Sequence, residues 1–163
     1  MSSSDLDNSS SSSHRPSSSP DAVRHVVVAG FGPVGRVVTE CLGRAGVEVT
    51  LIEMNEKTIG TQTRQGRRAV YGDVSEPKVL CEAGVEQCDA LILTIPDEEA
   101  ALRACAEARR LAPDLYISVR VHHPSGAMRA KAAGADHATI EELVTAYAME
   151  AAVEEHLGVG KAQ

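Results

Sequence analysis

Short apolar runs alternate with stretches of helical periodicity along the chain from residue 24 onward. The apolar runs cover residues 26–29, 47–52, 69–71, 90–95, 115–121 and 137–139. Patterns typical of helices lie between them, at residues 34–45, 57–65, 77–83, 97–111 and 125–133. This alternation is typical of parallel strands joined by helical crossovers. It predicts an α/β fold, a Rossmann-like doubly wound six-stranded parallel sheet in a three-layer α/β/α arrangement.

The composition of each run predicts its place in the sheet. Runs 26–29, 47–52 and 90–95 are almost unbroken Val, Ile and Leu, as expected of central strands covered by helices on both faces. The run 115–121 instead alternates strictly between apolar and polar residues. One face of this fifth strand should therefore be less deeply buried, or should meet another subunit or a ligand.

The last helical stretch, 141–157, carries a broad apolar set. Its members are Leu143, Val144, Tyr147, Ala148, Ala151, Ala152 and Leu157. That set is broad for a terminal helix. We expect the helix to dock onto its own sheet or onto a partner.

The chain divides into three parts: a tail at 1–22, a Rossmann domain at 23–140 and a terminal helical segment at 141–163. The first twenty residues contain eleven serines, a composition that predicts disorder. The tail is a solvated segment or, at Ser19-Pro20, a phosphorylated interaction arm. It has no apolar run for a signal peptide or a membrane span. We therefore expect a cytoplasmic protein without direct membrane insertion.

Length and charge narrow the function classes. The 163 residues fit one domain and leave no room for a second, substrate-binding domain. Aromatic residues make up only 2% of the chain and the net charge is −7. Single-stranded nucleic acids need aromatic platforms, and phosphate backbones need a basic face, so we expect no nucleic-acid partner.

The four cysteines, Cys41, Cys81, Cys88 and Cys105, lie far apart and form no CxxC pair. We therefore expect neither a zinc site nor a disulfide framework. We interpret them as small, mostly buried hydrophobic residues in a reducing compartment.

The clearest chemical motif is the glycine-rich turn Gly30-Phe31-Gly32-Pro33-Val34-Gly35. It follows the first apolar run and opens the first helical stretch, the context in which GxGxxG predicts nucleotide binding. The first glycine allows the turn, the second allows close approach of a pyrophosphate, and the third allows helix–strand packing. Free N–H groups and a partial positive charge at the helix start favour phosphate. Arg36 is a further phosphate contact or a solvated helix residue.

An acidic residue, Glu53, ends the second apolar run, eighteen residues after Gly35. Folds of this type place an acid there that accepts hydrogen bonds from the adenosine ribose hydroxyls. A 2′-phosphate would face this carboxylate, so NAD(H), AMP, ADP or ATP is favoured over NADP. The alternative is an exposed glutamate at a strand end.

Two further strand ends fall on the same edge of the predicted sheet, where open α/β folds bind ligands. Asp73 follows the third run and either contacts the adenine amino group or caps the next helix through Ser75. Thr94 follows the fourth run and lines the pocket near a second phosphate or the nicotinamide, or is simply a buried strand threonine. Asp97 is expected to cap the following helix.

Arg120 lies near the end of the fifth run and is followed by His122 and His123. We interpret Arg120 as an anion contact, with a surface arginine as the alternative. The histidine pair has no carboxylate or cysteine at ligand spacing, so no metal site is predicted. The candidate binding residues are Gly30, Phe31, Gly32, Pro33, Val34, Gly35, Glu53, Met54, Asp73, Val74, Thr94, Ile95, Pro96 and Arg120.

Longer segments resemble the RCK family, also called KTN or TrkA-N, the nucleotide-binding regulatory domains of potassium channels and of Trk, Ktr and Kef transport systems. The resemblance covers residues 24–150. It is carried by VVVAGFGPVGR at 26–36, LIEMNE at 51–56, VYGDVSEPKVLCEAGVEQCDALILTIPDEEAA at 70–101 and ISVRVHHPSGAMRAKAAGADHATIEE at 117–142. The motif Tyr71-Gly72-Asp73 and the run Ala133-Gly134-Ala135-Asp136 are more specific than the glycine turn alone.

The resemblance implies a domain that binds NAD(H) or another adenine nucleotide, forms a homodimer through a crossover helix at 141–163, and gates a membrane partner. It assigns phosphate to Gly30, Gly32 and Gly35, ribose to Glu53, adenine to Asp73, and the far half of the ligand to Thr94 and Arg120. No membrane pore is encoded, so we expect a separate potassium channel or transporter subunit, with the domain at the inner face of the membrane.

Three hypotheses follow for the function. The first is a regulatory sensor that binds a nucleotide without turnover and has no catalytic residues. The second is a small NAD-dependent oxidoreductase, for which His122 with Asp136 is the only candidate acid–base pair. The third is an assembly scaffold that binds nothing, against which the intact glycine turn and Glu53 argue.

Overall fold

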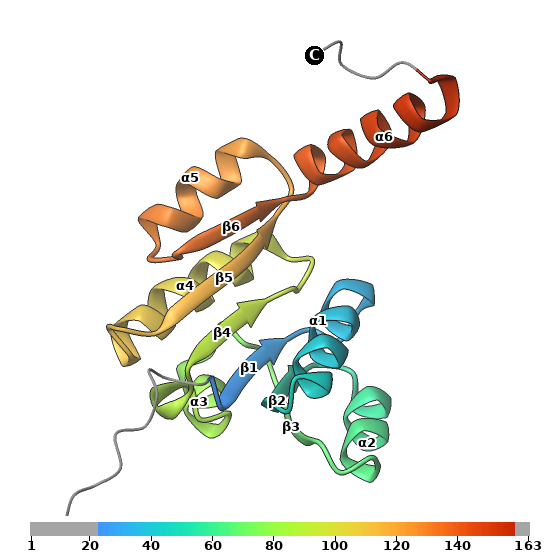
Figure 1. Ribbon diagram of the computed structural model, residues 1–163. Helices are drawn as coiled ribbons and strands as arrows, with labels where there is room; N and C mark the ends of the chain where they lie inside the picture. Colours follow the sequence, from blue (N-terminus) through green and yellow to red (C-terminus); the bar gives the residue numbers. More distant parts are fainter. Residues whose placement is uncertain (1–22, 159–163) are drawn as a thin grey trace, which may run out of the picture.

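Six strands form one sheet at the centre of the molecule in the computed structural model, which describes residues 23–158 (Figure 1). The strands are β1 (His25–Ala29), β2 (Glu48–Glu53), β3 (Arg68–Tyr71), β4 (Ala90–Leu93), β5 (Tyr116–Val121) and β6 (His137–Ile140). They lie in the order β3-β2-β1-β4-β5-β6, and every neighbouring pair is parallel. The predicted fold class is confirmed.

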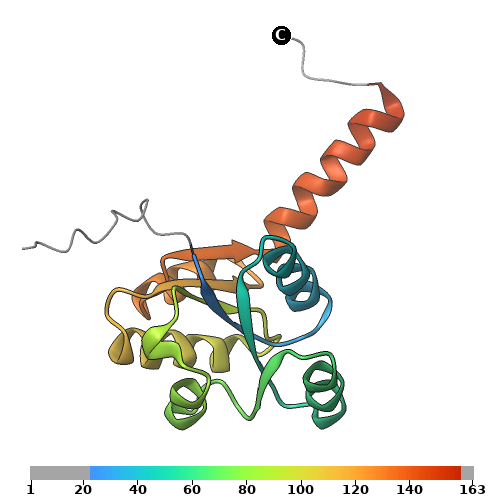
Figure 2. The ribbon, with the colours of Figure 1, turned by 60° about the horizontal axis from the view of Figure 1, so that its bottom comes forward.

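The helices form layers on the two faces of this sheet. They are α1 (Pro33–Arg44), α2 (Glu56–Arg64), α3 (Pro77–Glu82), α4 (Glu98–Leu111), α5 (Pro124–Ala132) and α6 (Glu141–Leu157), with a short 3-10 turn at Val85–Gln87. Helices α1 and α2 cover one face, and α3, α4 and α5 cover the other (Figures 1 and 2). The chain builds β1, β2 and β3 outward in one direction and β4, β5 and β6 in the other, so the strand order reverses beside β1.

Local sequence signals account for the helix starts. Pro33, Pro77 and Pro124 begin α1, α3 and α5, a position where the missing N–H has no intrahelical use. Asp97 accepts a hydrogen bond from the N–H of Ala100, at 3.0 Å, and caps α4 as predicted. Asn55 caps α2 because its side-chain oxygen accepts hydrogen bonds from the N–H groups of Lys57 and Thr58, at 3.0 and 3.1 Å; this cap was not predicted from the sequence.

The core has two parts, one on each side of the sheet. The larger part lies under α3, α4 and α5, and includes Leu80, Leu91 and Ile117. The smaller part, which contains Val28 and Leu51, is covered by α1. Strands β2, β1 and β4 lie next to one another inside the sheet, and almost all of their side chains are buried, as their unbroken apolar runs predicted.

Beyond β4, the α1 side of the sheet carries no helix among the described residues (Figures 1 and 2). The residues of strand β5 explain why this face needs no covering helix. Its apolar residues are buried toward α4 and α5, whereas Tyr116 is 47% exposed and Ser118 and Arg120 are half-buried on the open side. The predicted difference between the two faces of this strand is confirmed.

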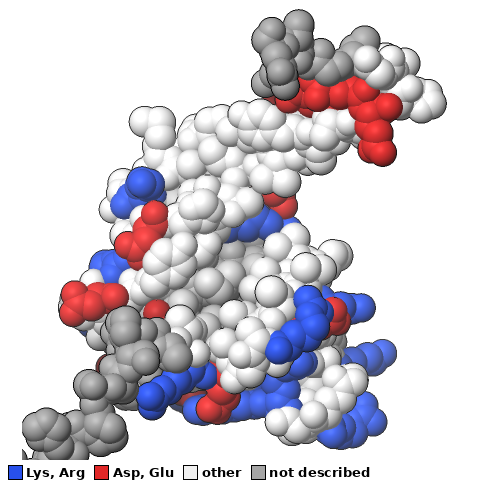
Figure 3. Space-filling view, in the orientation of Figure 1, with Lys and Arg blue, Asp and Glu red and all other residues white. Residues whose placement is uncertain are grey.

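Helix α6 leaves the sheet after β6 and projects away from the body (Figures 1 and 2). None of its residues is buried, and Val144 and Tyr147 are 54% and 65% exposed. The expectation that it docks onto its own sheet is therefore wrong, because the helix points outward from the sheet edge. On the face of α6 that Figure 3 shows, the middle of the helix is uncharged, with charges near its root and at its far end.

Two of the sequence interpretations concern residues outside the described part. The Ser-rich tail at 1–22 lies there, as do the last five residues of the 141–163 segment. Between residues 23 and 158, no helix has the combination of length and apolarity that crossing a bilayer requires.

Candidate functional site

The glycine turn joins β1 to α1 in a tight conformation. Gly30 has a φ of +92°, and its N–H donates to the carbonyl of Ile52 at 2.8 Å. A Cβ on Gly35 would lie 1.9 Å from the carbonyl oxygen of Gly30, so only glycine permits this approach of helix to strand. A Cβ on Gly32 would meet nothing within 4 Å. The space beside Gly32 is open to a ligand, and no side chain caps the first turn of α1.

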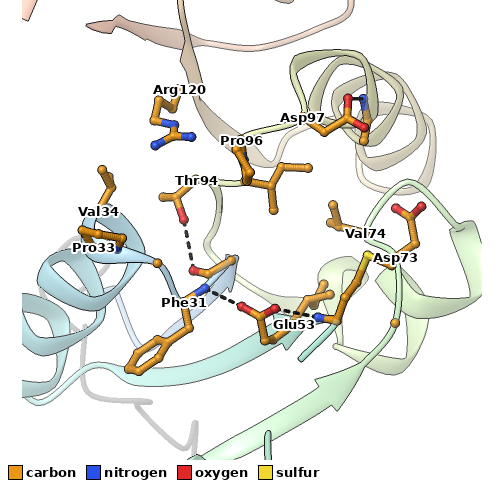
Figure 4. A pocket seen from close by; sticks show the side chains of 17 residues that line it. Phe31, Pro33, Val34, Glu53, Asp73, Val74, Thr94, Pro96, Asp97 and Arg120 are labelled. Carbon is orange, nitrogen blue, oxygen red and sulfur yellow. Dashed lines mark hydrogen bonds between the residues drawn. The ribbon is translucent and has the colours of Figure 1, made fainter. Parts of the chain in front are cut away.

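A cavity of about 510 Å³ lies over this turn, at the carboxyl ends of β1, β2, β3 and β4 (Figure 4). Every candidate residue except Gly35 lines it. Four lining residues were missed: Ile52, Gly72, Asp97 and Ala100. Each is close in sequence to a candidate residue. Open α/β folds bind ligands in the crevice where the strand order reverses, and this rule could have predicted that the neighbours of the candidates also line the cavity.

Glu53 binds the glycine turn through its carboxylate. Its Oε2 accepts the N–H of Phe31 at 2.8 Å, and its Oε1 accepts those of Met54 and Asn55 at 2.8 and 3.0 Å. A carboxylate has about four acceptor positions, so one remains for a ligand hydroxyl. The side chain is therefore held in one orientation before any ligand arrives, which is unlike the freely exposed strand-end glutamate considered as the alternative.

The ring of Phe31 points away from the cavity (Figure 4). The guanidinium groups of Arg36 and Arg67 lie 5.6 and 5.9 Å from its centroid, distances typical of cation–π contacts. Arg36 does not line the cavity. Of the two interpretations of Arg36, the structure favours the helix-surface one.

Thr94 is a buried residue that braces the turn. It is 7% exposed, and its hydroxyl lies 2.9 and 3.0 Å from the carbonyl oxygens of Ala29 and Gly30. Its single proton is thus directed at the backbone. Thr94 contributes to the shape of the cavity, and its hydroxyl is not a free donor for a phosphate.

Asp73 lines the cavity and also organises the turn before α3. Its Oδ1 accepts the N–H of Ser75 at 2.8 Å, which is an Asx turn of the kind that precedes helices. Both interpretations of Asp73 therefore remain compatible with its position: the turn contact is present, and Figure 4 shows the carboxylate at the cavity rim.

Within residues 23–158, Arg120 is the only Lys or Arg that lines the cavity. Figure 4 shows its guanidinium directed toward the space between Val34 and Thr94. Its Nη1 lies 3.0 Å from Oε1 of Glu141, the first residue of α6, and its side chain is 18% exposed. It is thus a half-buried, ion-paired residue, unlike the plain surface arginine of the alternative interpretation.

The two histidines after Arg120 lie beside different carboxylates. Nδ1 of His122 lies 3.3 Å from Oε2 of Glu98, and Nδ1 of His123 lies 3.3 Å from Oε2 of Glu142. The backbone N–H of His122 also donates to Glu98 and is the main cause that lowers the pKa of that carboxyl. No group of metal-ligating side chains that could hold an ion is present in residues 23–158.

The proposed acid–base pair of His122 with Asp136 is not formed. Asp136 instead accepts hydrogen bonds from the N–H of Ile117 at 2.7 Å and from Arg109 at 2.8 Å. These contacts lower the pKa of Asp136 and join β5 to the turn before β6. Asp136 is therefore a structural carboxylate.

The cysteines differ from one another in exposure. Cys105 is buried and Cys88 is partly buried, but Cys41 and Cys81 are exposed. The expectation that all four are mostly buried is wrong for these last two, which lie on the outer surfaces of α1 and α3. All four thiols are free.

Comparison with known proteins agrees with this architecture. The family model of the TrkA-N domain matches residues 26–141. YbaL of Escherichia coli K12, named as a cation/proton antiporter, is 31% identical over 103 residues, or 63% of this chain and 18% of its own length. KefB of Alkalimonas amylolytica, named as a K⁺ efflux antiporter, is 30% identical over 112 residues, or 69% of this chain and 17% of its own length. The chain thus spans less than a fifth of these relatives.

Solved structures show the same fold. The crystal structure of the TrkA-N domain of YbaL from E. coli superposes with a TM-score of 0.78 at 28% identity, covering 82% of this chain and 99% of that one. The AMP-bound Kef C-terminal domain of Shewanella denitrificans has a TM-score of 0.74 at 23% identity, covering 84% and 83%. The NAD-bound GsuK channel has a TM-score of 0.65 at 20% identity, covering 74% and 22%. Because the family model matches residues 26–141, well over half of the sequence, this chain belongs to the TrkA-N domain family.

Proposed function

We propose that this protein is a regulatory domain that binds an adenine nucleotide, with NAD(H) as the first candidate and AMP, ADP and ATP as further ones. One observation carries the proposal: the carboxylate of Glu53 is fixed 2.8 Å from the N–H of Phe31, at the edge of a cavity that also exposes Gly32 and the uncapped start of α1. A hydroxyl-binding acid therefore lies beside a phosphate-binding helix start. Relatives of the same fold are bound to AMP and to NAD.

The charges in the cavity favour NAD(H) over NADP(H). Among the described residues, three carboxylates, those of Glu53, Asp73 and Asp97, and one cation, Arg120, line the cavity. A 2′-phosphate on the adenosine ribose would meet the carboxylate of Glu53, and like charges at such a distance repel each other. The order of affinity we expect is NADH or another adenine nucleotide first and NADPH last.

We further infer that the domain forms a homodimer and controls potassium transport through a separate membrane subunit, at the cytoplasmic face of the membrane. Support for the dimer comes from α6, whose apolar residues Leu143, Val144, Tyr147 and Val153 are all exposed. Exposed apolar side chains that gather on one element are typical of interaction sites. Support for the transport role comes from the antiporters that carry a matching domain.

An NAD-dependent oxidoreductase is the second candidate. Its support is the glycine turn alone, which serves enzymes and sensors alike. The titratable side chains that line the cavity are carboxylates and one arginine, and His122 pairs with Glu98 and not with Asp136. The sensor is the better account because it requires only binding.

Titration calorimetry tests the proposal. The protein, stripped of carried-over nucleotide, is titrated with NADH, NAD, AMP, ADP, ATP and NADPH, and its mass is measured in parallel. Binding of one adenine ligand by a dimer without turnover supports the sensor. Hydride transfer to a small carbonyl compound would favour the oxidoreductase. Failure to bind any of the six nucleotides would favour the assembly scaffold that binds no ligand.

A further inference from the structure

Arg120 lies between two hollows of the surface. One is the nucleotide cavity. The other, of about 600 Å³, lies on the open side of β4 and β5 at the root of α6, and is lined by Val38, Ser118, Val144 and others. Val34, Thr94 and Arg120 line both hollows. The guanidinium of Arg120 therefore lies next to any ligand in the nucleotide cavity and also next to the base of α6 in the other hollow.

Apart from its covalent continuity with β6, the base of α6 is held by few hydrogen bonds and side-chain contacts. Glu141 pairs with Arg120 at 3.0 Å and with Nε2 of His122 at 3.6 Å. Glu142 pairs with His123 at 3.3 Å, and its N–H donates to the carbonyl of His122 at 3.3 Å. No residue of the helix is buried, and no side chain caps its start. The Arg120–Glu141 ion pair is thus one of three side-chain contacts at the start of α6, which follows directly from β6.

In the part of the chain that the structure describes, the same guanidinium is the only cationic side chain that lines the nucleotide cavity. An anionic ligand group in the space between Val34 and Thr94 would therefore meet Arg120 before any other cation (Figure 4). Glu141 partly neutralises that cation in the free protein. A ligand anion and Glu141 consequently compete for one positive charge.

We propose that Arg120 couples the two hollows: it holds Glu141 in the free protein and turns to a phosphate when a nucleotide binds, which loosens the base of α6. This inference rests on the proposed function, because it requires a nucleotide in the cavity. By linkage, removing Glu141 must strengthen nucleotide binding by the same factor by which the nucleotide weakens the Glu141 contact. The direction of the coupling is therefore measurable from binding alone.

ADP is the probe, and Glu141→Gln is the decisive variant. The change keeps the size of the side chain and removes the charge that competes for Arg120. Because the ion pair is partly exposed, we expect the Kd of ADP to fall about two- to fivefold. Arg120→Gln should weaken ADP binding about tenfold, and the double variant should match it, because Glu141 acts only through Arg120.

Glu142→Gln is the matched control. It removes the same charge from the adjacent residue of α6, which pairs with His123 and does not line the cavity. Hydrogen–deuterium exchange gives the second readout. ADP should accelerate exchange of the first hydrogen-bonded amides of α6 in the wild type, beginning with that of Glu142, which donates to the carbonyl of His122; in Glu141→Gln, exchange there should already be fast without ADP.

The outcomes are separable. Equal ADP affinity of Glu141→Gln, Glu142→Gln and the wild type would overturn the coupling while leaving nucleotide binding intact. Unchanged exchange at the base of α6 in the ADP complex would overturn it as well. Failure of the wild-type protein to bind any adenine nucleotide would instead refute the proposed function, and the coupling with it.

Discussion

Glu53, the last residue of β2, accepts the backbone N–H of Phe31 at 2.8 Å and so fixes the glycine turn from the neighbouring strand. The contact joins residues that are 22 positions apart. The proposed ribose acceptor and the proposed phosphate-binding turn are therefore one rigid unit. The first prediction follows from this contact.

Replacement of Glu53 by Gln should weaken the binding of NADH or of whichever adenine nucleotide binds best. The amide has only one acceptor oxygen, so it cannot hold the three backbone N–H groups and also accept a ribose hydroxyl. We expect a loss of about tenfold, the cost of one hydrogen bond to a charged group. Calorimetry measures it, and Glu48→Gln, at the exposed start of the same strand, is the control.

The Glu53→Arg variant tests the discrimination against NADP. An arginine there would attract a 2′-phosphate, so the preference for NADH over NADPH should shrink or reverse. Equal affinities of the wild type and both Glu53 variants for NADH would contradict the proposal that Glu53 accepts hydrogen bonds from the ribose hydroxyls.

Gly35→Ala should destabilise the domain and abolish nucleotide binding. The new Cβ would lie 1.9 Å from the carbonyl of Gly30, and relief requires α1 to move away from β1. The cost should be about 1–3 kcal/mol, as for overpacked cores. Urea unfolding followed by circular dichroism measures it.

Gly43→Ala, in the same helix, is the control for that experiment. Its Cβ would meet nothing within 4 Å, so the better helix propensity of alanine should raise stability by up to about 1 kcal/mol. Destabilisation by Gly43→Ala as large as that by Gly35→Ala would show that the close approach at Gly35 is not the cause.

Asp136 should contribute to stability in a pH-dependent way. The N–H of Ile117, and then Arg109, lower its pKa in the folded state below the ordinary value of 3.8. Its contribution is therefore present above pH 3.8 and is lost as the pH falls through the lower, folded value. Asp136→Asn should cost about 1 kcal/mol at pH 7, after allowance for solvent screening.

The difference between Asp136→Asn and the wild type should shrink on acidification to pH values below the folded pKa. Urea unfolding between pH 7 and acid measures it, with Asp114→Asn, an exposed change in the preceding turn, as the control. A pH-independent difference would mean that the loss comes from shape and not from charge.

The thiols should separate into two reactive classes. Burial raises the pKa of Cys88 to about 11 and that of Cys105 to about 12, so thiolate is scarce at both near neutral pH. Cys41 and Cys81 are exposed and should react with an aromatic disulfide reagent first. Peptide mass spectrometry identifies the modified residues, and rapid labelling of Cys105 in the native protein would contradict the buried core around α4.

Sequence patterns predicted the sheet because a strand that is buried on both faces consists almost entirely of apolar residues. The unbroken apolar run at 26–29, which lies in β1, is an example. These patterns also located the cavity, because the ends of parallel strands meet at one edge. The direction of α6 could not be predicted in this way. The sequence pattern of an apolar helix surface is the same whether its own sheet or another chain covers it. The Arg120–Glu141 pair was likewise invisible, because it depends on how β5 and the start of α6 are placed in space.

The exposure of Cys41 was misjudged for a related reason. Cysteine is most often buried, but position on a helix decides each case, and Cys41 lies on the outer side of α1. The sequence does not decide the role of Thr94, because the carbonyls that its hydroxyl contacts, those of Ala29 and Gly30, are 65 and 64 residues away.

The most direct test of the account is a titration of the isotope-labelled protein with NADH and with ADP, followed by amide NMR. The account predicts that one of them shifts the amides of Gly30, Phe31, Gly32 and Met54, around the cavity, and that the Glu48→Gln variant behaves identically. Shifts confined to other parts of the molecule, or none with either ligand, would contradict the claim that the glycine turn of this protein holds an adenine nucleotide.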